Sequence, residues 1–139
     1  MNRFVLRTRP WQYDAGALFV RLILGGLMIY SGQMKIYDYD KILPLFGDPI
    51  GLGTKLSFNL LIFSEFFCGI LVVIGLFTRL AVLPIMFSMG VAFFVAMRQS
   101  PFPEKELPFV FLALSIPVFF MGSGNISVDR LLYKKTILT

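Results

Sequence analysis

The sequence predicts an all-α polytopic membrane protein: an antiparallel four-helix transmembrane bundle that forms a single membrane domain over residues 1–139. Two observations lead to this prediction. First, 57% of the residues are hydrophobic and 15% are charged, whereas about a quarter of the residues of a soluble domain are charged. Second, the apolar residues form blocks long enough to cross a bilayer, separated by proline, glycine and charge. The lipid bilayer is therefore the first expected partner.

The first apolar block predicts a helix over residues 15–36. At 1.5 Å per residue it would extend about 33 Å, which is enough to cross ~30 Å of hydrocarbon. Three arginines precede it, as in a signal peptide: Arg3, Arg7 and Arg9. The block is longer than the core of a signal peptide and meets no small-residue cleavage site, so we expect a helix that is retained.

Residues 37–55 form the longest connection between the predicted helices. They include three aspartates, two prolines and three glycines, a composition that cannot cross a bilayer. We therefore expect an extramembrane loop here, and it is the best candidate for a lid or a partner surface.

The remaining apolar blocks predict helices over residues 56–77, 80–97 and 104–121. The second and third helices are separated by a tight turn, which makes them antiparallel neighbours. Prolines and glutamates suit the first turn of the fourth helix, and Pro117 should kink it. Residues 125–132 are expected to form a short amphipathic piece before a basic tail.

The basic residues lie at the edges of the apolar blocks. The net charge of +5 therefore indicates orientation in a membrane rather than binding to nucleic acid. In the four-helix arrangement, seven lysines and arginines fall on the side of the chain termini and five on the opposite side. This bias places both termini in the cytoplasm.

The sequence contains no histidine and one cysteine, Cys68. The protein ligands that hold haem, iron–sulfur clusters, zinc and copper are therefore nearly absent. We expect no metal site and no cofactor bound by this chain alone. A single thiol cannot form an internal disulfide, and we interpret Cys68 as a packing residue.

Glu65 lies near the middle of the second predicted helix. An ionised carboxylate there costs at least a few kcal/mol, so it must be protonated, paired or exposed to a wet cavity. Gly69 shares its helical face, which places Glu65 in the interior of the bundle. Either Arg21 or Lys35 of the first helix could reach it, and the spacing does not choose between them.

The first helix carries a charge near each end of one face, with small residues between them. The spacing puts five residues on that face: Arg21, Gly25, Met28, Gly32 and Lys35. The two glycines would let another helix approach closely. A structural interpretation stays open for Lys35, which is near enough to the membrane interface to extend its amine into water.

Arg98 and Gln99 end the third predicted helix on the same side of the membrane as Lys35. We expect them to form a polar vestibule above Glu65. The candidate ligand-binding residues are therefore Glu65, Lys35, Arg21, Arg98 and Gln99, and no catalytic residue is assigned. On the opposite side, Arg79 and Asp129 are expected to form an ion pair that ties the turn between the second and third helices to the chain after the fourth.

Three short motifs resemble those of the DoxX family of small four-helix membrane proteins. They are Arg21-Leu22 with Gly25, Gly32 and Lys35; Ser64-Glu65 with Gly69, followed by residues 75–79; and residues 122–124 leading to 127–129. The resemblance extends over residues 15–132. It implies a four-helix bundle in the bacterial cytoplasmic (inner) membrane and a link to redox physiology, including thiosulfate:quinone oxidoreductase, oxidative stress and thiol handling. Many relatives carry a histidine where Arg98-Gln99 stand here, which puts a histidine-dependent redox step in doubt.

Two functions are compatible with these observations. In the first, the chain is the membrane subunit of a quinone- or thiol-linked oxidoreductase complex, in which Glu65 with Lys35 or Arg21 binds a quinone and a redox partner supplies the electrons. The alternative is a non-enzymatic membrane scaffold, or a binder or carrier of a small metabolite. The glycine faces allow a homo-oligomer in both cases.

Overall fold

The computed structural model describes residues 10–138, with side chains from Gln12 onward. Arg3, Arg7 and Arg9 lie outside the described residues. The described chain is helical and contains no β-strand. Its elements are α2 (Pro10–Tyr37), α3 (Tyr39–Phe46), α4 (Thr54–Ile62), the π-helical η1 (Phe63–Phe67), α5 (Cys68–Ile74), α6 (Thr78–Val91), the π-helical η2 (Ala92–Ala96), α7 (Phe102–Met121) and α8 (Val128–Leu138).

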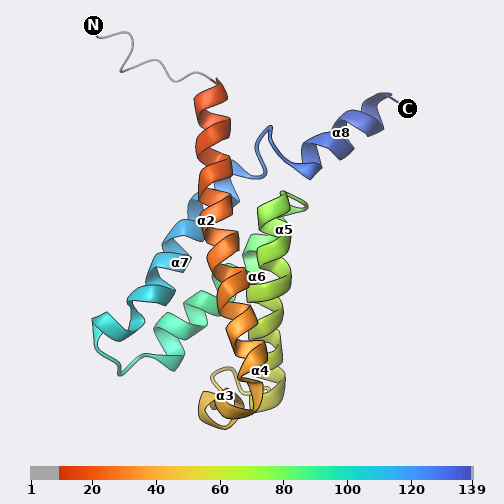
Figure 1. Cartoon of the computed structure of the whole chain (residues 1–139). Helices are drawn as coiled ribbons and strands as arrows, with labels where there is room; N and C mark the ends of the chain where they lie inside the picture. The colour runs from red at the N-terminus through yellow and green to blue at the C-terminus, as the bar shows by residue number, and fades with distance from the viewer. Residues whose placement is uncertain (1–9, 139) are drawn as a thin grey trace, which may run out of the picture.

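Four long segments alternate in direction: α2, the continuous helix α4–η1–α5, the continuous helix α6–η2, and α7 (Figure 1). Three stretches are long and apolar enough to cross a membrane: Gln12–Tyr37, Thr54–Ile74 and Thr78–Ala96. The described chain is thus an all-α polytopic membrane protein. The beginning of α2 and the whole of α8 lie at one end of the bundle, and α3 lies at the other (Figure 1).

The fourth long segment, α7, differs from the other three in the charge at its beginning. Its 20 residues begin with a charged turn that contains Glu104, Lys105 and Glu106. The apolar remainder, residues 107–121, extends only about 22 Å at 1.5 Å per residue. Glu104 lies in the first helical turn, where a negative charge favours the helix dipole.

The connection over residues 37–55 contains a helix, α3, that the sequence analysis did not predict. Apolar side chains recur along one face of α3, and two of its rings pack on α4: the centroid of Phe58 is 5.2 Å from that of Tyr39 and 5.1 Å from that of Phe46. The hydroxyl of Tyr39 also donates to Oδ1 of Asn59 at 2.7 Å. The aspartates and prolines that indicated a loop therefore coexist with a short helix laid across the end of α4.

Glycine brings α2 against the second long helix. A Cβ added at Gly25 would lie 2.5 Å from Cγ2 of Val73 and 2.8 Å from the carbonyl oxygen of Gly69, and one added at Gly32 would lie 2.9 Å from the backbone nitrogen of Phe66. Only hydrogen fits at these distances. The prediction that glycines on this face admit a neighbouring helix is confirmed.

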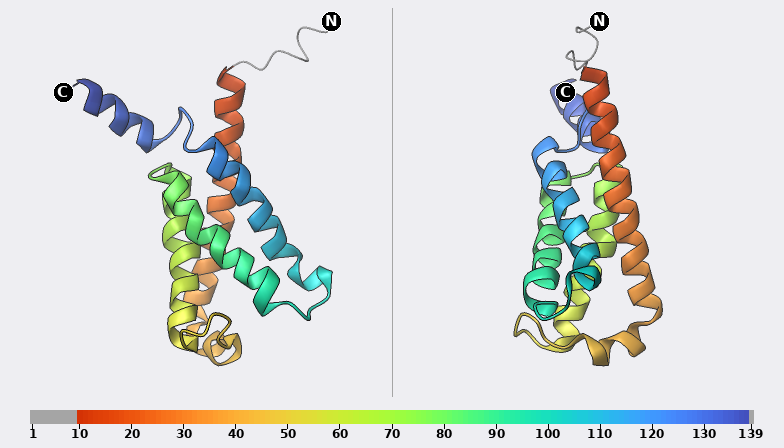
Figure 2. Two further views of the ribbon diagram at one scale, coloured as in Figure 1. Left: turned by 180° about the vertical axis from the view of Figure 1, so that it is seen from behind. Right: turned by 90° about the vertical axis from the view of Figure 1, so that its left-hand side faces the viewer.

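The buried core lies where the four long segments meet. It contains Leu24 and Met28 from α2, Cys68 and Val72 from α5, and six residues of α6 and α7: Ala81, Val82, Ile85, Met89, Phe111 and Val118. Cys68 is 3% exposed, as expected of a packing residue. The third and fourth long segments, α6–η2 and α7, lean away from α4, and the separation is greatest at the turn that joins η2 to α7 (Figure 2).

Candidate functional site

A π-helical turn carries Glu65 into the interior of the bundle. In η1, residues Phe63–Phe67, the helix takes up an extra residue per turn, and such turns occur frequently at functional sites. Ser64 and Glu65 are 3% and 2% exposed. They extend from the same turn toward different neighbours, because Ser64 bonds to α6 and Glu65 bonds to α2.

Lys35, in the last turn of α2, is the partner of Glu65. Its Nζ lies 2.8 Å from Oε2 of Glu65 and donates a second hydrogen bond, also 2.8 Å long, to Oγ of Ser31. The Lys35 side chain remains 23% exposed, whereas that of Glu65 is 3% exposed. The pair is therefore buried at the carboxylate and open at the amine, and the close approach of Gly32 to Phe66 holds the two helices at this distance.

Arg21 lies in a different cluster, at the opposite end of the bundle. It is 1% exposed and donates to the carbonyl oxygens of Ser123, Ile126 and Val73, the last two at 3.0 and 3.4 Å. It fastens the chain that follows α7 to α2 and α5. The structure therefore selects Lys35, not Arg21, as the cation beside Glu65, and Arg21 takes the part of a structural anchor.

The polar vestibule expected above Glu65 is not assembled. Arg98 and Gln99 lie in the turn between η2 and α7 and are exposed. Within residues 10–138, neither forms a hydrogen bond or an ion pair with Glu65 or Lys35. The cause is the lean of α6–η2 and α7 away from α4 (Figure 2). The polar neighbour that the pair does have is Ser31 of α2, whose hydroxyl accepts a hydrogen bond from Lys35.

The prediction that Arg79 and Asp129 form an ion pair is wrong. Each of them instead forms hydrogen bonds to the backbone of the other segment, so both still connect the start of α6 to the chain at and after the end of α7. Among the described side chains, Arg79 and Asp129 are not within salt-bridge distance of each other. Asp129 accepts hydrogen bonds from the backbone amides of Phe77, at 2.9 Å, and Thr78, at 3.5 Å. A carboxylate here satisfies free amides at the start of α6. Arg79 instead donates to the carbonyl oxygen of Phe120 at 3.4 Å.

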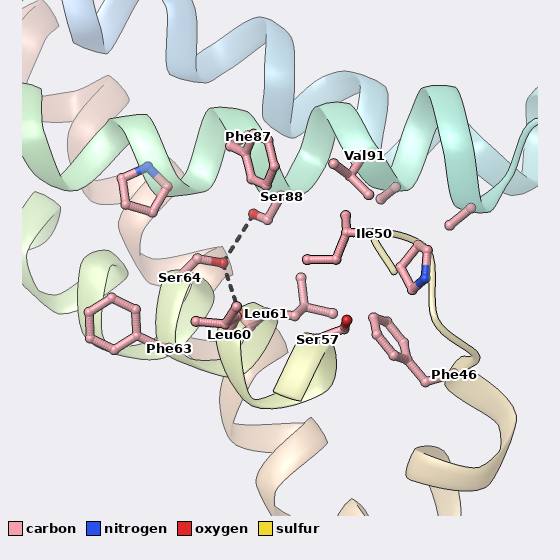
Figure 3. Close-up of a pocket in the computed structure, with 14 residues that line it drawn as sticks. Phe46, Ile50, Ser57, Leu60, Leu61, Phe63, Ser64, Phe87, Ser88 and Val91 are labelled. Atoms are coloured by element: carbon pink, nitrogen blue, oxygen red, sulfur yellow. Dashed lines mark hydrogen bonds between the residues drawn. The ribbon is translucent and has the colours of Figure 1, made fainter. Parts of the chain in front are cut away.

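The structure also contains a cavity that the sequence analysis missed. It has a volume of about 290 Å³ and lies between the second and third long helices, closed at one end by Phe46 and Ile50 of the loop (Figure 3). Inside it, Oγ of Ser64 lies 3.0 Å from Oγ of Ser88. None of the fourteen lining residues is charged. Its lining residues come from two separate stretches of the chain, residues 46–64 and 84–96, so no single local pattern in the sequence indicates it.

Together these features define a polytopic membrane protein with a buried lysine–glutamate pair and a separate neutral cavity. The described residues contain no group of three histidine, cysteine, aspartate or glutamate side chains that could hold a metal ion. The chain belongs to the DoxX family, whose model matches residues 16–98. The match includes Lys35, Ser64 and Glu65 and ends before the motif at residues 122–129. Searches of curated proteins and of solved structures find no significant match.

Proposed function

We propose that this DoxX protein is the membrane subunit of a quinone- or thiol-linked oxidoreductase complex, and that Lys35 and Glu65 bind the polar head of a quinone. The single observation that supports the proposal is the geometry of this pair. Its carboxylate is buried at 3% exposure and its amine is 23% exposed, so a ligand can approach the pair through Lys35. We further propose that the complex lies in a bacterial cytoplasmic membrane, with both chain ends in the cytoplasm.

Lys35 has a donor to offer such a ligand. An ammonium group carries three N–H donors, and Glu65 and Ser31 take two of them. The third can bond to a quinone carbonyl. A charge in the membrane-spanning part of a protein is costly and is a mark of ligand and proton pathways, which supports a functional role for the pair.

The redox step assigned to this site needs a partner. Reduction of a quinone to a quinol consumes two electrons and two protons. The electrons come from a donor in the partner enzyme, which is oxidised by two electrons. Lys35 passes one proton to the quinone oxygen that it binds and recovers it from water at its exposed side, while the ionised Glu65 holds Lys35 in place. The other quinone oxygen takes its proton from water.

The test compares gently purified wild-type protein with Glu65→Gln by mass spectrometry of retained lipid-soluble molecules and proteins. We expect the wild type to retain a quinone that the variant loses, together with a redox partner that both retain. Glutamine has the size of glutamate and can still form hydrogen bonds, so we expect the Glu65→Gln variant to keep the helix content of the wild type. Retention of bulk lipid alone by both proteins would contradict the proposal.

The alternative is a non-enzymatic scaffold or a binder of a small molecule. One observation favours it: the charge of Glu65 is already met by Lys35, so the pair could serve only to hold α2 against η1. A stable complex with a redox enzyme whose turnover stops when this chain is removed would exclude the alternative.

A further inference from the structure

The cavity between the second and third long helices has the properties of a second binding site. Its volume of about 290 Å³ is at the lower end of the range for small-molecule pockets, ~300–1,000 Å³. Both π-helical segments contribute to its wall: Phe63 and Ser64 come from η1, and Ala92 and Ala96 come from η2. Since π-turns are rare and cluster at functional sites, two of them on one cavity are an independent sign of a ligand site.

The lining determines the chemical class of the ligand. Eleven of the fourteen lining residues are apolar and the other three are serines, so a charged ligand would lose its hydration without finding a counter-charge. The rim residues Leu60, Phe63 and Phe87 are 44%, 49% and 65% exposed on helices that cross the bilayer. The cavity is therefore reached from the lipid side, which requires a lipid-soluble ligand.

Two serine hydroxyls give this cavity a polar point. Ser64 lies 3.0 Å from Ser88 and 2.8 Å from the carbonyl oxygen of Leu61, and Ser88 lies 3.0 Å from the carbonyl oxygen of Ile85. Each hydroxyl has one proton and two lone pairs, so the pair can turn to accept one hydrogen bond from a ligand or donate one to it. Figure 3 shows the two hydroxyls directed at each other across the cavity wall.

We propose that this cavity binds a small, neutral, lipid-soluble molecule whose apolar ring or branched body fills the space and whose one hydroxyl or carbonyl group bonds to Ser64 and Ser88. The site is independent of the proposed quinone function, because neither Lys35 nor Glu65 lines the cavity. The cavity and the Lys35–Glu65 pair share one element, η1, which directs Ser64 to the cavity and Glu65 to Lys35.

The loop between α3 and α4 closes the outer end of the cavity. Pro49 and Ile50 of this loop line the cavity, together with Phe46 at the end of α3. Asp48 holds the loop in place by accepting hydrogen bonds from the backbone amide of Gly53, at 2.9 Å, and from the hydroxyl of Ser57, at 3.1 Å. Ser57 is itself a lining residue. The loop is therefore fastened to the wall of the cavity that it covers.

The test uses two photoreactive probes on the full chain in lipid nanodiscs: an aryl diazirine and the same compound carrying a benzylic hydroxyl. On illumination each loses N₂ and inserts into nearby bonds, and mass spectrometry of peptides locates the insertions. We expect the alcohol to label the cavity wall roughly fivefold more than the parent probe, the factor that one hydrogen bond gives. Ser64→Ala/Ser88→Ala should remove this excess.

Matched variants separate binding in the cavity from general contact with lipid. Ser115→Ala removes a buried serine, 0% exposed, that does not line the cavity, and should change nothing. Ala92→Phe fills the cavity and should abolish labelling of its wall by both probes, whereas Ala113→Phe, on the exposed face of α7, should not.

Glu65→Gln should leave the labelling intact, so that failure of the quinone proposal and failure of this one can be told apart. Equal labelling by both probes that is indifferent to Ser64→Ala/Ser88→Ala would mean that only lipid chains enter, and would overturn the proposal. So would labelling of the cavity wall that persists in Ala92→Phe.

Discussion

At the scale of single residues, the main feature is the ion pair between Lys35 of α2 and Glu65 of η1. Glu65 was recognisable from the sequence because a carboxylate in the middle of an apolar block needs a reason to be there. Its partner was not, because Arg21 and Lys35 lie on the same face of α2 and each has a side chain long enough to reach several ångströms. Only the three-dimensional structure shows that Arg21 is engaged by carbonyl oxygens at the other end of the molecule.

Removing one charge of the pair should destabilise the protein more than removing both. Lys35→Met or Glu65→Leu alone leaves an uncompensated group and should lower the free energy of unfolding by about 3 kcal/mol, the lower end of the range for buried pairs, since Lys35 is partly exposed. The double variant Lys35→Met/Glu65→Leu should recover most of that loss. Chemical unfolding in mild detergent measures all three, and additive losses would contradict the pairing.

At the scale of elements, the helices were predictable and their irregularities were not. Apolar periodicity and length locate the four long segments. These two signals do not reveal the π-turns η1 and η2, because an extra residue in a turn does not change the composition of the helix. The helix α3 was hidden for the opposite reason: its Asp40 and Pro44 are of residue types typical of loops. Its stability depends on the rings of Tyr39 and Phe46 packing against Phe58.

Two adjacent glycines of α2 provide a matched test of the close approach between α2 and α5. Gly25→Ala places a methyl group 2.5 Å from Val73 and 2.8 Å from the carbonyl of Gly69, whereas at Gly26 no atom lies within 4 Å of the added Cβ. We expect Gly25→Ala to cost about 1–3 kcal/mol, as overpacking does, and Gly26→Ala to be neutral or slightly stabilising. Thermal unfolding in one detergent compares them, and equal midpoints would refute the close contact.

The loop after α3 should respond to pH through Asp48. The hydrogen bond from the backbone amide of Gly53 holds the pKa of Asp48 below its ordinary value. A lowered pKa in the folded state means that the ionised carboxylate stabilises the loop above the ordinary pKa of about 3.9, and that this contribution is lost as pH falls through the lower, folded value.

The amide proton shift of Gly53 in NMR spectra should therefore titrate with a midpoint below about 3.9, and the titration should vanish in Asp48→Asn. Asp40→Asn, which removes an exposed carboxylate on α3, is the control that should leave it unchanged. A midpoint at or above the ordinary value would show that the loop does not favour the ionised form.

At the scale of the whole molecule, the membrane class follows from composition alone, whereas the arrangement of the bundle does not. Hydropathy gives the number of long helices and their alternation. The lean of α6–η2 and α7 away from α4 (Figure 2) depends on how side chains pack between helices. That lean separates Arg98 and Gln99 from Glu65, and the cavity lies in the neighbouring space between the second and third helices. The hydropathy pattern and the positions of the charges in the sequence therefore predict the buried carboxylate but not the cavity.

The orientation in the membrane is open to a direct test. Starting from Cys68→Ala, single cysteines are introduced at Gly51, in the loop after α3, and at Tyr133, in α8. In intact bacterial cells, a membrane-impermeant maleimide should label the cysteine at position 51 and not the one at position 133. Both should react in opened vesicles. The reverse pattern in intact cells would place the chain ends outside.

We propose that Lys35 and Glu65 form a ligand site and not merely a structural contact between α2 and η1. The double variant Lys35→Met/Glu65→Leu tests it most directly, because it removes both charges without leaving either unpaired. The measurement is the dissociation constant of a short-chain ubiquinone analogue for the wild type and the double variant in nanodiscs. We predict that the double variant keeps most of the wild-type stability and binds at least tenfold more weakly, which corresponds to about 1.4 kcal/mol. Unchanged affinity in a folded double variant would contradict the claim.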